Sequence, residues 1–155
     1  MMGFRTIGSL LISLFILVSC THVDVKSNIK EYSEPCSMDV VDTRPDKKML
    51  SGSIIHTIEI TPPIETVLKS KLCTTPKIFD YSVKQPIFIE ITDLKYAYSD
   101  ETVFIITAGV RTRGESYIIQ SIGKEYYIGL PSTRIERLLD YSLDDFAKKL
   151  ILKLQ

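Results

Sequence analysis

Cys20 is the residue of this chain whose position most plainly indicates a chemical reaction. It ends the series Leu17, Val18, Ser19, Cys20, at the close of an apolar segment that follows Arg5. A cysteine thiolate is a good nucleophile, and the small or β-branched residues before it let the peptide lie extended in a protease. The pattern therefore predicts cleavage before Cys20 and attachment of a lipid to its sulfur.

The apolar segment 7–18 has the length of a signal-peptide core. A helix over these residues, at about 1.5 Å per residue, would reach roughly 18 Å, short of the roughly 30 Å hydrocarbon layer of a membrane. We expect such a leader to be removed and to take no part in the fold. An ordinary secretory signal that contains a cysteine and a short uncleaved anchor are the alternatives.

The residues from Leu17 to Cys20 resemble the bacterial lipobox. The resemblance implies a mature chain that starts at Cys20 and carries a covalent diacylglyceryl group and an N-acyl chain. Three acyl chains hold a protein on a membrane almost permanently. In a Gram-negative host, Thr21 in place of an aspartate after the lipidated cysteine implies an outer-membrane anchor facing the periplasm.

The length and charge of the remaining chain indicate one domain without nucleic-acid partners. We expect a signal peptide at 1–19, a lipidated flexible tether at 20–35 and a single α+β periplasmic domain at 36–155. Loss of Arg5 with the leader leaves a formal net charge of −1, and basic residues are mixed with acidic ones. This balance argues against nucleic-acid binding, and no stretch after the leader is apolar enough to cross a bilayer.

Cys36 and Cys73 are the cysteines that remain after lipidation. In an oxidising compartment they can form a disulfide, worth roughly 3 to 4 kcal/mol in the chain-entropy model. Two separate buried thiols are the alternative. The two histidines, His22 and His56, have no spacing with the cysteines that suits a zinc site, so we expect no metal and no cofactor besides the covalent lipid.

Periodicity along the chain predicts a mostly antiparallel sheet of about five or six strands with two helices packed on one face. Strands are expected at 37–42 and 53–60, paired with each other, and a helix at 62–72 with Thr61 as its N-cap. A loop should follow at 74–85. A meander of three strands then begins at Ile87, with a bulge near Asp93.

The C-terminal segment predicts an amphipathic helix from Ser132, because apolar residues recur there at helical spacing. Ser142 and Asp145 have the spacing of a capping box, so a kink is an alternative.

The candidate chemical groups of the domain favour structural roles. Asp42 and Arg44 could act as an acid and base pair at a functional site, but we expect Asp42 to bind turn amides and Arg44 to pair with a surface carboxylate. Asp140, Asp144 and Asp145 are near one another on the last helix, where a solvated face is the expected arrangement rather than a calcium site. The chain is therefore expected to be no enzyme.

A hydrophobic strand that ends in Asp42, Thr43, Arg44 and Pro45, after a lipobox cysteine, is similar to the YajG family of outer-membrane lipoproteins. The order of elements is also similar, whereas Cys36, Cys73 and the 74–85 linker depart from the family pattern. Related architectures occur in auxiliary lipoproteins of lipid-trafficking ABC transporters and in the lipopolysaccharide-assembly lipoprotein. The resemblance implies action through binding partners rather than through turnover.

Two functions follow as hypotheses. The first is an accessory module that binds another envelope protein through aromatic residues on the sheet face opposite the helices: Phe88, Tyr96, Tyr98, Tyr117, Tyr126 and Tyr127. These side chains could instead pack in the core. The second is a carrier or auxiliary subunit that holds a lipid or other apolar ligand between sheet and helices, which requires an enclosed apolar cavity.

Overall fold

The computed structural model describes residues 21–29, 32, 36–48, 56–98, 101–126 and 131–155. The predicted leader and the cleavage and lipidation residues Leu17, Val18, Ser19 and Cys20 lie outside these residues. The described elements follow one another as β1 (Thr21–Lys26), β2 (Met38–Asp42), β3 (His56–Thr61), α1 (Ile64–Cys73), α2 (Pro76–Lys84), β4 (Ile87–Tyr98), β5 (Thr102–Arg111), β6 (Ser116–Glu125) and α3 (Pro131–Lys153).

A four-stranded sheet with the order β2-β4-β5-β6 forms the base of the fold, and β4, β5 and β6 are its antiparallel meander. The predicted bulge is present, because the register of β4 against β5 shifts between Ile91 and Asp93. The shift keeps Leu94 and Tyr96 on the same buried side as Ile89 and Ile91. The predicted α+β class and the meander are therefore confirmed.

The predicted pairing of the first two strands of the domain is wrong. β2 runs parallel to β4, and β3 runs parallel to β1 in a separate two-stranded sheet. Parallel neighbours need a long crossover, and the chain between β2 and β4 supplies one that includes α1 and α2.

The predicted flexible tether at 20–35 is also wrong over its described part. Residues 21–26 form β1, and the side chain of Val25 is fully buried. Ile29 and Tyr32 pack against the core, and the Tyr32 amide donates to Ser70 Oγ at 3.1 Å. Pairing with β3 satisfies the backbone of a segment whose composition alone looks like a linker.

α2 occupies the region predicted to be a loop. Pro76 stands in its first turn, Ile78 and Ser82 are its buried residues, and Ser82 Oγ donates to Phe79 O at 2.8 Å. Thr74 and Thr75 separate α2 from α1, and their hydroxyls donate to carbonyls in the last turn of α1. A helix of only nine residues that follows two threonines and begins with a proline has the local composition of a loop.

The other two helices follow the predictions closely. α1 begins at Ile64, after a cis Thr61–Pro62 bond, with Pro63 rather than Thr61 in the N-cap position. α3 is one helix from Pro131 to Lys153, so no new helix begins at Ser142. Ser142 Oγ lies 3.0 Å from Ser121 Oγ on β6, and Asp145 Oδ2 accepts the amide of Ile122 at 2.9 Å.

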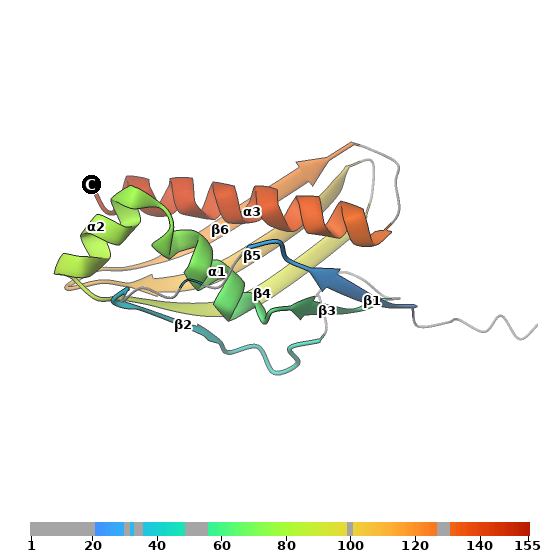
Figure 1. Cartoon of the computed structure of the whole chain (residues 1–155), viewed down its shortest axis with the longest axis horizontal. Helices are drawn as coiled ribbons and strands as arrows, with labels where there is room; N and C mark the ends of the chain where they lie inside the picture. Colours follow the sequence, from blue (N-terminus) through green and yellow to red (C-terminus); the bar gives the residue numbers. More distant parts are fainter. Residues whose placement is uncertain (1–20, 30–31, 33–35, 49–55, 99–100, 127–130) are drawn as a thin grey trace, which may run out of the picture.

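All three helices lie against the same face of the four-stranded sheet (Figure 1). The core between them is apolar and includes side chains with no exposure from both layers: Leu68, Leu72, Ile78, Ile89, Ile91, Leu94, Phe104, Ile106, Leu138, Leu139, Leu143, Phe146 and Leu150. β1 also contacts α3 on this side. The opposite face of the sheet is not covered by any described element.

Candidate functional site

The uncovered sheet face is the surface of the described chain best suited to binding. Alternate residues of the four strands project from it in register, for example Asp39 beside Phe88 beside Arg111. Val41 of β2 is 38% exposed and Ile118 of β6 is 76% exposed on this face. A face that leaves such side chains in water is a candidate interaction surface.

Phe88 and its neighbours give one end of this face a defined structure. The Arg111 guanidinium carbon lies 4.4 Å from the centre of the Phe88 ring, which is cation–π geometry. Arg111 Nη2 also donates to Glu90 Oε1 at 3.0 Å. The ring and two charged groups therefore hold one another across β4 and β5.

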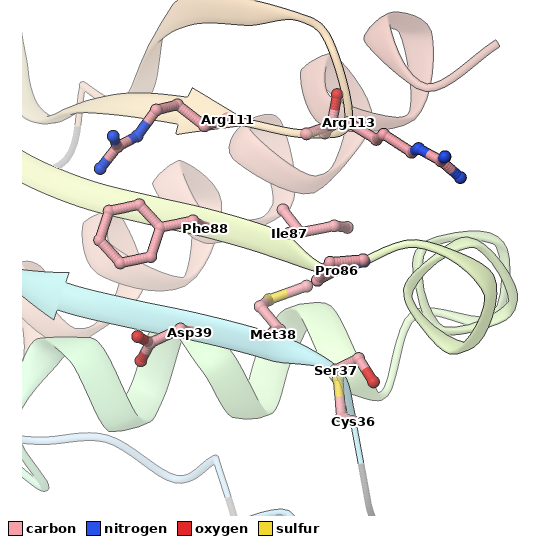
Figure 2. A pocket seen from close by; sticks show the side chains of 10 residues that line it. Cys36, Ser37, Met38, Asp39, Pro86, Ile87, Phe88, Arg111 and Arg113 are labelled. Atoms are coloured by element: carbon pink, nitrogen blue, oxygen red, sulfur yellow. The ribbon is translucent and has the colours of Figure 1, made fainter.

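An open groove of about 730 Å³ lies at the same end of the sheet (Figure 2). Its apolar lining comes from Met38, Pro86, Ile87 and Phe88, at the starts of β2 and β4. Arg111 is the last residue of β5, and Arg113 stands in the tight turn before Gly114, whose φ of 98° the turn requires. In Figure 2 the side chains of the two arginines extend in opposite directions, so their guanidinium groups do not converge on one anion.

The Asp42 and Arg44 side chains, singled out in the sequence, form a buried ion pair with each other. Arg44 Nε lies 2.9 Å from Asp42 Oδ1, and Arg44 Nη2 lies 2.7 Å from Asp42 Oδ2. As expected, Asp42 binds a turn amide, the N–H of Arg44, at 3.2 Å. The carboxylate seen to pair with Arg44 is the buried one of Asp42. Arg44 also donates to Lys47 O at 3.0 Å, so the pair fixes the loop that contains Pro45.

A second groove, of about 330 Å³, lies beside this pair. The charged side chains around it are already matched: Lys48 Nζ lies 3.2 Å from Glu59 Oε2, and Lys47 Nζ lies 3.7 Å from Glu65 Oε1. The groove therefore presents no excess charge of either sign.

Cys36 and Cys73 are joined by a disulfide in the structure, with Cα atoms 6.1 Å apart. The sequence left open either a disulfide or two separate thiols, and the structure contains the disulfide. The bond ties the segment before β2 to the last residue of α1, next to the end of the sheet where the 730 Å³ groove lies.

The predicted aromatic surface is only partly present. Tyr96 is 7% exposed and belongs to the core, and Phe88 and Tyr117 are half-buried. Tyr126 is exposed and its hydroxyl donates to Glu101. The side chains of Tyr98 and Tyr127 lie outside the described residues. Tyr96 is buried because the bulge turns it toward the helices.

The open face instead owes its apolar character to aliphatic residues that the aromatic pattern did not reveal: Val41, Val103, Ile105, Ile118 and Ile122. A strand buried on one face normally alternates apolar with polar residues. In β5, apolar residues occupy both the positions that face the helices and those that face away from them. This pattern is the signal that could have identified the open surface.

Groups with displaced pKa values are scattered over the described structure. Hydrogen bonds from Tyr126 and Lys124 lower the pKa of Glu101. Burial raises the pKa of Tyr117, at the start of β6, to about 12, and burial also raises the pKa of Asp140 on α3. These positions do not converge on one cleft.

The aspartates of α3 that could have bound calcium are engaged with basic side chains. Asp144 pairs with Lys71, and Asp145 Oδ2 lies 2.7 Å from Lys149 Nζ. Within the described ranges, no cluster of three metal-ligating side chains is present. No helix of the described part has both the length and the apolar character needed to span a bilayer.

Known structures resemble this chain in fold. The chain matches no protein-family model and no curated protein. An uncharacterised protein of known crystal structure aligns over 86% of this chain and 99% of its own, with 9% identity and a TM-score of 0.52. Protein XCC0632 from Xanthomonas campestris, described with the family DUF330, aligns over 86% of this chain and 95% of its own, with 11% identity and a TM-score of 0.50. The chain therefore shares its fold with these proteins.

Proposed function

We propose that this protein is an outer-membrane lipoprotein similar to the YajG family, anchored by lipids on Cys20, that binds another envelope protein without catalysing a reaction. The series Leu17, Val18, Ser19, Cys20 supports the anchor, and Thr21 supports the outer membrane. The domain faces the periplasm and serves as an accessory module.

The uncovered face of the four-stranded sheet is the observation that carries this proposal. One face is sealed by three helices over a filled core, while the other leaves Val41 and Ile118 exposed to solvent. Burial of such side chains by a partner yields about 25 cal/mol for each Å² removed from water. A partner is the most economical explanation for an apolar sheet face left open in a small domain.

The position of β1 fits a module anchored to a membrane at one end. In Figure 1, β1 starts at the end of the molecule opposite α2 and the C-terminus. An anchor directly before Thr21 would leave the groove with Phe88, Arg111 and Arg113 at the end far from the membrane. That end would then be accessible to a periplasmic partner.

Site-specific photocrosslinking in cells tests the proposed surface. A photoreactive residue in place of Val41, on the open sheet face, should crosslink to an envelope protein. The matched control is Val83 on α2, which is 61% exposed but lies on the helical side. Equal crosslinking at both positions, or none at Val41, would contradict the proposal.

A carrier for a lipid or another apolar molecule is the second candidate. Core side chains fill the space between sheet and helices where its ligand was expected, so the open 730 Å³ groove, with its apolar lining, is the site that would hold the ligand. Displacement of a fluorescent fatty acid distinguishes the two functions. Saturable binding that is lost in Phe88→Ser and kept in Val83→Ser would support the carrier. Absence of binding would leave the accessory module as the proposal.

A further inference from the structure

β6 is an edge strand of the sheet, and side chains of α3 bind the outward-pointing backbone groups of its second half. Asp145 accepts the amide of Ile122 at 2.9 Å, and Lys149 Nζ donates to Gln120 O at 2.8 Å. Both backbone groups point away from β5, since their partners lie on α3. These contacts protect the second half of the edge from pairing with another chain.

The first half of the same edge has no such protection among the described residues. Hydrogen-bonded pairs alternate along an antiparallel ladder, so the N–H and C=O of Ile118 point outward like the N–H of Ile122. The turn confirms this alternation, because the Thr112 amide donates to Glu115 O. Backbone groups at Ser116 and Ile118 are thus free to pair with an added strand.

A groove of about 410 Å³ runs beside this free edge, between β6 and the last turns of α3. Ile118 and Leu152, which line it, are 76% and 70% exposed, the two most exposed large aliphatic side chains of the described residues. An extended peptide in this groove would receive main-chain hydrogen bonds from Ile118 and apolar contacts from both side chains. This combination is the mode of recognition called β-strand addition.

The positive charge beside the groove indicates which kind of peptide would bind there. Lys149 and Lys153 line it, and its lining contains no carboxylate. Lys149 Nζ is already held by Asp145 and by Gln120 O, so the charge offered to a ligand is that of Lys153. A second copy of this chain would add the same positive charge, whereas a strand with acidic side chains complements it.

We propose that the free half of β6 binds an extended segment of a partner protein in which acidic and apolar residues alternate. The inference rests on the proposed accessory function and specifies how the partner is held. It requires the β6 edge and α3 only, so it does not depend on lipidation at Cys20.

Binding of synthetic peptides to the full-length protein in detergent tests the inference. A seven-residue peptide of alternating glutamate and valine should bind at least about tenfold more tightly than the same peptide with lysine for glutamate, and high salt should reduce this difference. A version with a central proline should not bind, because proline cannot complete the ladder.

Three matched pairs of variants locate the site. Lys153→Glu should weaken the acidic peptide roughly fivefold, whereas Lys148→Glu, on the same helix but outside the groove, should not. Leu152→Ser should weaken binding and Val83→Ser should not. Ile118→Pro should abolish binding, while Ile118→Thr, which keeps the backbone N–H, should retain part of it.

Three outcomes would overturn the inference. They are equal affinity for acidic and basic peptides, equal effects of Lys148→Glu and Lys153→Glu, and a concentration-dependent dimer that Ile118→Pro dissolves, which would make a second copy the occupant. Failure of these peptides leaves lipidation untouched, and a failed lipidation experiment leaves the peptide result untouched.

Discussion

At Gly123 the strand β6 passes α3 so closely that a methyl group does not fit. A Cβ built on Gly123 would lie 2.0 Å from Leu138 O and 2.9 Å from the amide nitrogen of Ser142. Both are backbone atoms, which cannot swing aside as a flexible side chain can. The contact sets the distance between sheet and helix at the place where Ser121 meets Ser142.

Gly123→Ala should therefore destabilise the protein by about 3 kcal/mol or more, since a core without room for added atoms must shift its backbone. Gly109→Ala is the control, because no heavy atom lies within 4 Å of a Cβ there. Its free energy of unfolding should stay within about 0.5 kcal/mol of the wild type. Urea unfolding of both variants measures the contrast, and similar losses in the two would contradict the described contact.

The buried pair of Asp42 and Arg44 should respond differently to single and double replacement. Arg44→Met leaves the Asp42 carboxylate buried without its guanidinium and should cost about 3 to 5 kcal/mol. The double variant Asp42→Asn with Arg44→Met removes both charges and should cost less than the sum of the single changes. A double-mutant cycle by chemical denaturation provides the measurement, and additive losses would show that the pair is not coupled.

Tyr117 should make the protein less stable at high pH. Burial raises the pKa of its hydroxyl from 10.0 to about 12 in the folded state, so the unfolded chain releases this proton first. Stability contributed by the protonated group is complete below pH 10 and is lost as the pH rises toward 12. Tyr117→Phe should therefore lose stability less steeply than the wild type over this window. Replacement of the exposed Tyr141 by Phe should leave the wild-type slope unchanged, and identical slopes for all three proteins would contradict the assignment.

Among the helices and strands, the sequence pattern predicted correctly those features that depend on residues close together in the chain. The β4–β6 meander, its bulge at Asp93 and the amphipathic α3 each leave a periodic signal within their own residues. The parallel pairings of β2 with β4 and β3 with β1 could not be predicted in this way, because they join segments distant in sequence.

The candidate site was predictable to a smaller extent. The sequence drew attention to Asp42 and Arg44, but it did not show that the two side chains bind each other. Two oppositely charged residues so close in sequence can point to solvent or to each other. The edge groove of β6 escaped prediction for a related reason. Its walls, Ile118 and Leu152, come from elements that only the fold brings together.

The disulfide between Cys36 and Cys73 should stabilise a large part of the fold. It closes a loop of 37 residues in sequence separation that contains β2 and β3 and ends at α1. Its loss should reduce the free energy of unfolding by roughly 3 to 4 kcal/mol, because the unfolded chain gains conformational entropy. Denaturation of the wild type with and without reductant measures this effect. The double variant Cys36→Ser with Cys73→Ser should not respond to reductant, and a wild type that ignores reductant would contradict the prediction.

At the scale of the whole molecule, the fold has two unlike faces and two unlike ends. Helices cover one face of the sheet and leave the other open, and β1 begins at the end opposite α2 and the C-terminus (Figure 1). Anchored before Thr21, such a body would present its open face and the free edge of β6 to partners in the periplasm. The central claim is therefore the lipid on Cys20, since the orientation of the domain at the membrane depends on it.

Metabolic labelling with an alkyne analogue of palmitate tests that claim most directly. The wild type and the double variant Cys36→Ser with Cys73→Ser should both incorporate the label and sediment with the outer membrane, because both keep Cys20. Cys20→Ser should incorporate none. Equal labelling of Cys20→Ser and the wild type, or an unlabelled wild type in the soluble periplasmic fraction, would contradict the account.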